Sequence, residues 1–566
     1  MASRTFDKSL AARLGTAGFV ILVGLLIVGP TGHLLANALL GRGSFDLGPA
    51  ISVLTQRGTV QAIVNTIIYV VGVSVLSVLI GVPLAFLAER TDISPTAKRA
   101  INLAVISALI TPAFLTAMAY VNLLGPNAGV INVWLRSLLG LSINRGPFDV
   151  YNILGVLLLG AQQSVAFVFL IAAAAFSKMN PELEEAAAIS GAKRWRIVAT
   201  VTLPVVRNSI FAGAILALAS ALADYGTPHM LGFTVLTLRI RTYMLQADFV
   251  SAAVVSLLLV AMSLVVLALY RRSLGKGSFA TVTGKSFHPS PFRIGRARHV
   301  LTFVAYAYAF LSVVLPVLGL LSTSLLERLG FGFRLDNLTL QHYADIIGGD
   351  GFVLRAIWNS LQLATGAAMI CAVLAAFVAF ITVRQRGGAS ILLDYIVVIP
   401  LGIAGTALAV ALIMTVTSFP LRDLALYGTL WILLLAYVIR QLPLAVRPSQ
   451  ASLMQVSPEL EQAARLAGAN WGQTMFTITV PLIRPGLIAG GIIVFLSCLT
   501  ELSASIILRH IGTDTIATAI MDLWDGGGGY QRASAVAVVV FVAMVALVAA
   551  AQIITGRSLY DDRDSM

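Results

Sequence analysis

The chain has 566 residues, of which 58% are hydrophobic and only 11% are charged. A soluble globular domain carries roughly 25% charged residues, so this composition excludes a soluble enzyme and a disordered tail. It predicts an all-α membrane protein that crosses the bilayer many times. Basic loops beside the membrane explain the net charge of +13 better than a nucleic acid partner does.

Twelve apolar stretches are long enough to cross a membrane, which takes about 20 residues. They cover residues 17–40, 62–87, 100–123, 150–176, 208–231, 250–270, 299–322, 357–382, 391–416, 427–447, 486–507 and 533–555. The first stretch is longer than the apolar region of a signal peptide, so we expect a retained first span. Arg440 and Pro443 make 427–447 the weakest of the twelve.

The Lys and Arg residues indicate how these spans are oriented. With both termini in the cytoplasm, 26 of the 38 basic residues fall in inside segments and 12 fall outside. Because basic residues concentrate in cytoplasmic loops, we expect both termini to lie inside the cell.

The loop after the fourth stretch, residues 181–207, is long and has a helical pattern. Pro181 suits the first turn of a helix, and the acidic residues after it lie near the positive end of the helix dipole. Gly191 allows a tight turn, and a second helix is expected to end before Pro204. A short, slim, polar helix of this kind suits the groove of a partner protein. The alternative is a plain surface connector.

Asp224 lies inside the next apolar stretch, where a charge is costly and therefore suggests a function. It is about 16 residues from the inner end of its span, or roughly 24 Å along a helix, in the outer part of the bilayer. We expect it to line a pathway as part of a polar ring or gate. The alternative is a capped or snorkelling carboxylate near the outer surface.

A polar, basic stretch at residues 271–298 is rich in Gly and Pro. These features predict a cytoplasmic linker beside anionic lipid. It divides the chain into two units of six spans each, residues 1–270 and 299–566, which run parallel in the membrane.

The second unit repeats the motifs of the first. The loop motif recurs at residues 458–484, at an offset of 277 residues, and Asp224 matches Glu501 at the same offset. Upstream, Asn65 matches Asn359 at an offset of 294, so an insertion or deletion lies between the motifs. Both Asn residues lie near span starts and are expected to form structural hydrogen bonds.

The repeated loop resembles the EAA loop of ATP-binding-cassette (ABC) importer permeases, whose pattern is E-A-A-x3-G-x9-I-x-L-P. The first copy reads E-A-A-x3-G-x9-V-x-L-P from Glu185 to Pro204, and the second reads Q-A-A-x3-G-x9-I-x-V-P from Gln462 to Pro481. The resemblance covers nearly the whole chain, as two fused six-span units of the type I importer class. Gln462 replaces the family's Glu, and a neutral hydrogen bond there would be roughly half as strong as a charge-assisted one.

This resemblance implies that each loop is a coupling helix seated on one of two cytoplasmic ABC ATPase subunits. A periplasmic solute-binding protein would deliver the solute to this complex in a bacterial inner membrane. The residues implied to act in coupling are Glu184, Glu185, Ala186, Ala187, Gly191, Glu461, Gln462, Ala463, Ala464 and Gly468. In this family the fifth core span lines the pathway, which supports a pathway role for Asp224 and Glu501.

The energy source is expected to belong to the partner. The sequence contains no phosphate-binding loop of the form G-x4-G-K-[ST], so ATP and Mg would be bound by the ATPase. We therefore expect no cofactor, no metal and no catalytic residue in this chain. The expected partners are the ATPase subunits, the binding protein and membrane lipid, with no nucleic acid.

The fused layout resembles that of iron(III) importer permeases, and so do the stretches from Ala223 to Pro228 and from Thr500 to Ser505. Thiamine and 2-aminoethylphosphonate permeases share this layout, and polyamine permeases are more distant relatives. Iron(III) is the favoured solute. The main alternative class is a gradient-driven secondary transporter, in which the long loops would have no role. A membrane scaffold and a membrane enzyme are further alternatives.

Overall fold

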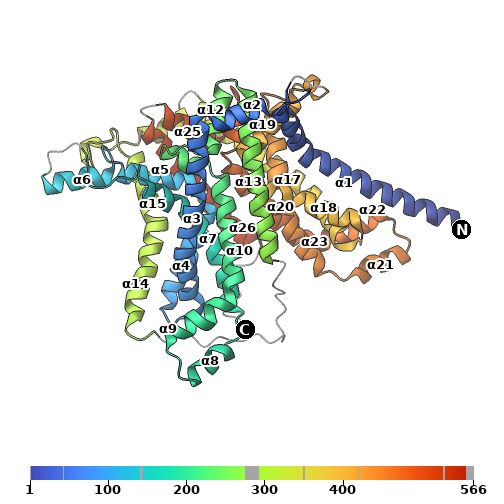
Figure 1. Cartoon of the computed structure of the whole chain (residues 1–566), viewed down its shortest axis with the longest axis horizontal. Coiled ribbons are helices and arrows are strands. Elements are labelled where there is room, and N and C mark those ends of the chain that lie inside the picture. Colours follow the sequence, from blue (N-terminus) through green and yellow to red (C-terminus); the bar gives the residue numbers. More distant parts are fainter. Residues whose placement is uncertain are drawn as a thin grey trace.

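The computed structural model describes residues 2–41, 44–140, 145–274, 292, 294–348, 351–385, 387–418, 420–526 and 529–555 (Figure 1). In these ranges, ten helices are long and apolar enough to cross a membrane. Two bent helix pairs raise the number to twelve if each pair is one span. The predicted class, an all-α protein with about twelve membrane helices, is confirmed.

The elements before the predicted linker are α1 (Ala2–Leu39), β1 (Leu40–Gly41), β2 (Ser44–Phe45), α2 (Gly48–Thr55), α3 (Arg57–Arg90), α4 (Pro95–Ile110), α5 (Ala113–Leu124), α6 (Val130–Leu139), α7 (Ile153–Ser177), α8 (Glu182–Ile189), α9 (Arg194–Ile197), η1 (Val198–Thr202), α10 (Leu203–Ala223), α11 (Gly226–Met230), α12 (Leu236–Leu245) and α13 (Phe249–Leu274). The two short strands pair antiparallel, with Leu40 opposite Phe45.

The elements after it are α14 (Ala297–Ala309), η2 (Phe310–Val314), α15 (Leu315–Ser324), η3 (Leu335–Asn337), α16 (Gln341–Gly348), α17 (Phe352–Arg384), α18 (Gly388–Val398), η4 (Ile399–Gly402), α19 (Gly405–Val416), η5 (Leu421–Leu424), α20 (Leu430–Met454), α21 (Pro458–Leu466), α22 (Trp471–Thr474), η6 (Met475–Thr479), α23 (Val480–Leu499), α24 (Ser505–Leu508), α25 (Ile516–Asp525) and α26 (Tyr530–Thr555). Residues 275–291 and 293 of the predicted linker lie outside the described residues, so the division into units stays a prediction.

Two of the predicted spans, 100–123 and 391–416, each consist of two helices that meet at a sharp bend. α4 meets α5 at 106°, and the helix Gly388–Gly402 meets α19 at 111°. Pro112 causes the first break, because its ring holds the preceding Thr111 in an extended conformation (φ −78°, ψ 124°). In these two segments a continuous apolar stretch therefore did not form a continuous helix. In the weakest predicted stretch, 427–447, residues 430–447 by contrast belong to one unbroken helix, α20.

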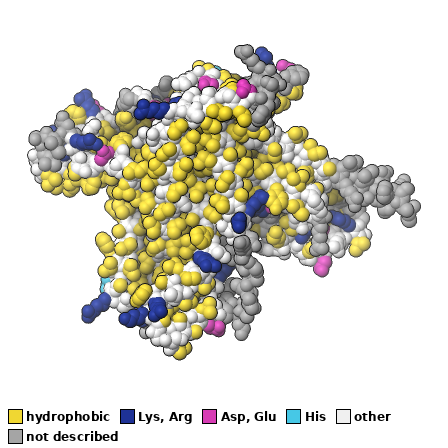
Figure 2. All heavy atoms as spheres, in the orientation of Figure 1, with side chains coloured by type: hydrophobic (Ala, Val, Ile, Leu, Met, Phe, Trp, Pro, Cys, Tyr) yellow, Lys and Arg dark blue, Asp and Glu magenta, His cyan; other side chains and the backbone are white. Residues whose placement is uncertain are grey.

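Each unit packs around three long helices, which are α3, α7 and α10 in the first and α17, α20 and α23 in the second. The first span of each unit lies against the other unit. α1 contacts α18 and α19, whereas α14 and α15 contact α4 and α5. The largest cluster of buried apolar residues accordingly contains residues of both units, from Val20 to Met544. Apolar side chains also cover the flanks of the helices (Figure 2), as a lipid-facing surface requires.

Three π-helical segments carry helices past prolines. The second loop helix, α9, does not end before Pro204 as predicted, because η1 continues it into α10 as one span from Arg194 to Ala223. In an α-helix the proline ring would clash with the carbonyl four residues earlier, and the wider π turn lies at that point. η6 precedes Pro481 and η2 precedes Pro316 in the same way.

Candidate functional site

The two repeated loops have matching backbone conformations. α8 follows Pro181 and ends at Ile189, and α21 runs from Pro458 to Leu466. The glycines after them have positive φ angles, 81° at Gly191 and 92° at Gly468. Because this left-handed region disfavours residues with a Cβ atom, glycine permits the tight turn that the sequence predicts.

A buried ion pair holds each loop against the membrane helices. Glu184 pairs with Arg90 at the end of α3 and accepts a hydrogen bond of 2.6 Å from the Thr202 hydroxyl. Both charged side chains are buried. Glu184 therefore faces the membrane helices and cannot contact a partner in this conformation.

The second loop repeats this arrangement. Arg384 Nε lies 3.0 Å from Glu461, and the Thr479 hydroxyl donates to the same carboxylate at 3.4 Å. Sequence reasoning placed both Glu residues in the coupling set but missed their Arg and Thr partners. The signal was present, because Arg90 matches Arg384 and Thr202 matches Thr479 at the offsets of the repeat. A charge that is buried requires a partner of opposite sign.

The opposite face of each loop helix is exposed. Glu185 and Gln462 lie on it, together with two apolar pairs that sequence reasoning missed. Ile189 is 88% exposed and its equivalent Leu466 is 90% exposed. The second pair, Leu183 and Leu460, is about half exposed. Matched apolar side chains at equivalent exposed positions are typical of a surface that a partner covers.

Asp224 and Glu501 each follow the end of a long helix, where the chain breaks before a short helix. The Asp224 carboxylate accepts hydrogen bonds from the Tyr69 hydroxyl (2.7 Å) and from the backbone N–H of Thr227 (3.2 Å). It thus satisfies a free N–H group of α11. The carboxylate therefore caps a short helix, and both the pathway role and its alternative stay predictions.

Glu501 plays the same part in the second unit but has a charged partner. Its carboxylate accepts from the backbone N–H of Ala504 at 2.7 Å, and Arg440 Nε lies 3.6 Å away. Gly405, the first residue of α19, leaves room for this arginine, because a Cβ there would lie 2.4 Å from a guanidinium nitrogen. The first unit has Gln163 at the position of Arg440, so only one unit carries this positive charge.

Tyrosines from different helices pack near the two carboxylates. In the first unit Tyr69 of α3 lies over Gly160 of α7, where a Cβ would meet the phenol oxygen at 2.4 Å. In the second unit the positions are exchanged, because Leu363 replaces Tyr69 and Tyr437 replaces Gly160. The Tyr437 hydroxyl lies 2.7 Å from the Ser505 hydroxyl. The tyrosine therefore comes from a different helix in each unit.

The two breaks meet each other across the units. The Ser503 hydroxyl donates to the carbonyl of Ala223 at 3.3 Å. A Cβ on Gly226 would lie 3.2 Å from the side chain of Leu502. The interface between the units is therefore closed at the level of the breaks. We call this contact of Ala223 and Gly226 with Leu502 and Ser503 the break junction.

A polar cluster joins the units close to the break junction. His229 Nε2 lies 3.0 and 3.2 Å from the two carboxylate oxygens of Asp525, and Arg241 lies 3.7 Å from the same group. Tyr225 stacks on the His229 ring and accepts a hydrogen bond from Arg241. Burial opposes ionisation of Asp525, but the His229 hydrogen bond and the Arg241 charge outweigh it and lower the pKa of the carboxyl.

The Asn residues of the repeat support the short helices near the breaks. Asn65 donates to the carbonyl of Thr234 at 2.9 Å, and Asn359 donates to that of Asp514 at 2.9 Å. The next residues, Thr66 and Ser360, accept from the first N–H groups of α12 and α25. These bonds confirm the structural role expected for both Asn residues.

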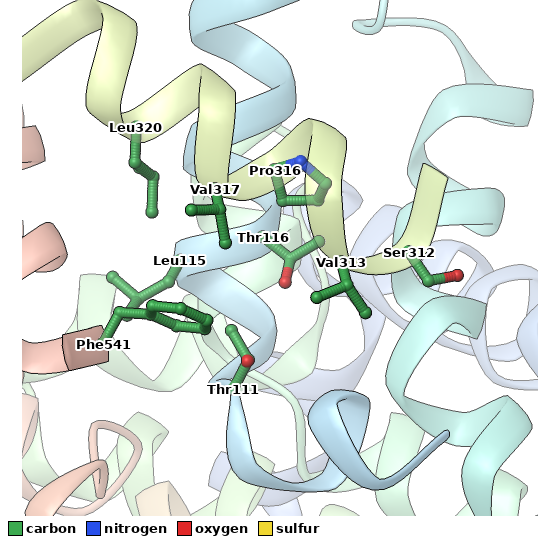
Figure 3. A pocket seen from close by; sticks show the side chains of 9 residues that line it. All are labelled: Thr111, Leu115, Thr116, Ser312, Val313, Pro316, Val317, Leu320 and Phe541. Atoms are coloured by element: carbon green, nitrogen blue, oxygen red, sulfur yellow. The ribbon is translucent and has the colours of Figure 1, made fainter. Parts of the chain in front are cut away.

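A small cavity lies where α15 of the second unit packs against the bend of the first (Figure 3). Pro316 and Val313 face Thr116 and Leu115 there, and Phe541 of α26 closes one side. Its volume of about 10 Å³ leaves room for no more than one water molecule. It is a packing gap between the units and not a solute site.

Comparisons with known proteins agree with this arrangement. Residues 77–274 match the family described as the inner membrane component of binding-protein-dependent transport systems. The putative ferric transport system permease FbpB 1 of Haemophilus influenzae is 25% identical, over 89% of this chain and 78% of its own. The ferric transport system permease FbpB of Actinobacillus pleuropneumoniae is 24% identical, over 96% and 78%. The probable ABC transporter permease y4fN of Sinorhizobium fredii is 27% identical, over 89% of both.

Proposed function

We propose that this chain, which belongs to the family of inner membrane components of binding-protein-dependent transport systems, imports iron(III) as the two-unit permease of an ABC importer. One observation carries the choice of solute. Two ferric permeases align with 89% and 96% of this chain, across both copies of the loop. Thiamine, 2-aminoethylphosphonate and polyamines are the alternative solutes for such a permease.

The loops α8 and α21 are the proposed contacts with two ATPase subunits, one on each loop. Their exposed apolar residues, Ile189 and Leu466, support this role because each would be covered by a partner's groove. The ion pair from Glu184 to Arg90 links α8 directly to α3. A push on the loop would therefore be passed to a long membrane helix. ATP and Mg belong to the partner in this proposal.

The loops lie on the cytoplasmic side and the break junction faces the periplasm in this proposal. The distribution of Lys and Arg residues, 26 inside and 12 outside, supports this orientation and places both termini in the cytoplasm. A periplasmic binding protein would then release its solute on the side of α12 and α25.

The transport cycle follows from the contacts between the units. The break junction is closed between Ala223 and Ser503, whereas α8, at the bottom of the view, lies well apart from α21, at its right (Figure 1). ATP binding would bring the two loops together and part the junction. The solute would then pass between the units, beside Asp224 and Glu501. A change between two states requires contacts that differ between them. Here these are the contacts of the two loops with the ATPase subunits and the contacts of the break junction.

Co-purification in detergent tests the partner, with the tagged chain and the ATPase encoded beside it expressed together. Wild type should retain about two ATPase subunits per chain, the ratio that two loops predict. Ile189→Asp with Leu466→Asp should lose them, because both changes place a charge on the proposed interface and remove no buried side chain. Ile511→Asp is the matched control, since Ile511 is also exposed and lies in the loop between α24 and α25.

Retention of the ATPase by the double variant would contradict the proposed docking surface. Uptake of radioactive iron(III) by proteoliposomes, with the binding protein outside and ATP inside, then tests the solute. Uptake that needs an ion gradient and no ATP would point instead to a secondary transporter.

A further inference from the structure

Among the described residues of the second unit, no helix corresponds to α6. Residues 125–152 connect α5 to α7, whereas residues 417–429 connect the equivalent helices α19 and α20, with 15 fewer residues. This difference accounts for most of the change in offset between the repeated motifs, from 294 to 277. Since the second unit completes the same fold without such a helix, α6 is an addition to it.

The polar side of α6 faces the protein. The buried Asn132 side chain donates to the carbonyls of Leu124, Gly125 and Phe148 at 2.9 to 3.1 Å. Its oxygen accepts from the N–H of Phe148 at 3.1 Å. These bonds fix how the helix is rotated about its axis, so its other side must face outward.

The outward side of α6 is apolar. Trp134 and Leu138, one helical turn apart on this side, are 59% and 63% exposed. A helix that lies on a protein in water normally buries its apolar side and exposes its polar side. α6 does the reverse. Its surroundings on the outward side must therefore be less polar than water.

The length and position of α6 indicate what covers it. Ten residues span only about 15 Å, about half the hydrocarbon thickness of a bilayer. The helix projects sideways from the bundle beside α5 and α15, on the side away from α8 (Figure 1). Apolar side chains of the spans continue along the underside of this projection (Figure 2). Its apolar side is thus continuous with the surface that lipid covers.

We propose that α6 is an interfacial helix that lies on the periplasmic leaflet, with the side chains of Trp134 and Leu138 in the upper acyl region. Tryptophan is enriched at this depth of a membrane, and short amphipathic helices bind there through their apolar side. A loop of the second unit packs on α6, where a Cβ on Gly332 would lie 3.3 Å from Val133. Through this contact α6 holds both units at the membrane surface. This placement depends on the proposed orientation only for the choice of leaflet, and not on the solute.

Spin-label accessibility tests this placement in the full chain, reconstituted into phosphatidylethanolamine and phosphatidylglycerol vesicles. The native Cys371 and Cys498 are buried, so an introduced surface cysteine is the one that reacts. We compare Leu138→Cys on α6 with Ile189→Cys on α8. Both residues are exposed, so neither change removes core packing.

Oxygen, which concentrates in lipid, is expected to broaden the spectrum of the label at residue 138. A water-soluble nickel chelate is expected to leave that spectrum unbroadened. The label at residue 189 should show the opposite pattern. Equal nickel broadening at both sites would place α6 in water and overturn the proposal. Low accessibility to both reagents at residue 138 would also overturn it, because it would mean that a protein surface covers the helix.

Discussion

Glu184 and Glu185 are neighbours in the chain but perform different tasks. Glu184 is buried against Arg90, whereas Glu185 is exposed on the proposed partner face. Removing one member of a buried pair leaves the other charge unpaired, at a typical cost of 3–5 kcal/mol. Glu184→Gln is therefore expected to lower the thermal unfolding temperature of the purified permease in detergent. Glu185→Gln is the matched control and should leave that temperature unchanged.

The same pair of residues shows how far a motif can be interpreted. The repeat located both loops, their glycine turns and the residues that belong to them. It could not tell which side of α8 faces the membrane helices, because that depends on Arg90, which lies 94 residues away. A stability loss in Glu185→Gln as large as that in Glu184→Gln would contradict this division of tasks.

The two units differ in which helix supplies the tyrosine near the carboxylate. Tyr69 of α3 lies over Gly160 of α7 in the first unit, whereas the second unit has Leu363 and Tyr437 at the equivalent positions of α17 and α20. Gly160→Tyr alone would overfill this space, with an expected cost of about 1–3 kcal/mol. Adding Tyr69→Leu rebuilds the arrangement of the second unit and should recover most of that loss.

A double-mutant cycle of these changes, followed by thermal unfolding in detergent, measures the coupling between the two positions. Effects that simply add would show that the residues do not share this space. The Tyr69 hydroxyl also donates to Asp224. Tyr69→Phe, which keeps the ring, separates loss of that bond from loss of volume.

Breaks within elements were the hardest feature to predict. Pro112 divides one apolar stretch into two helices at 106°, whereas Pro443 and Pro448 lie inside the continuous helix α20. Pro204 follows a π-helical turn and breaks nothing. A proline always removes one N–H donor. Whether the chain bends, widens or continues there depends on the helices packed around it, which a local pattern does not contain.

At the scale of the whole molecule, the sequence predicts two parallel units, and the structure adds the contacts between them. The first span of each unit packs on the other unit, and the breaks meet at Ala223 and Ser503. These contacts join residues that lie far apart in the sequence, 280 positions in the case of Ala223 and Ser503, and they leave no periodic signal. The proposed transport cycle depends on them, because opening toward the periplasm must separate the junction.

Asp525 provides a test of that opening. Its carboxylate joins α25 of the second unit to His229 and Arg241 of the first. Because the carboxyl is more than a third exposed, the contact is worth no more than about 1 kcal/mol. Asp525→Asn should make opening easier in the proposed importer. It should therefore raise ATP hydrolysis in the absence of solute by up to about fivefold at neutral pH.

The pH dependence of this contact follows from the lowered pKa of Asp525. A carboxyl whose pKa is lower in the closed state stabilises that state above its ordinary pKa, near 4, and loses the effect as the pH falls through the lowered value. The difference in hydrolysis between wild type and Asp525→Asn should therefore shrink as the pH falls below about 4. Asp522→Asn is the matched control, because Asp522 pairs with Arg509 of its own unit. Equal hydrolysis by wild type and Asp525→Asn at neutral pH would show that the contact does not hold the units together.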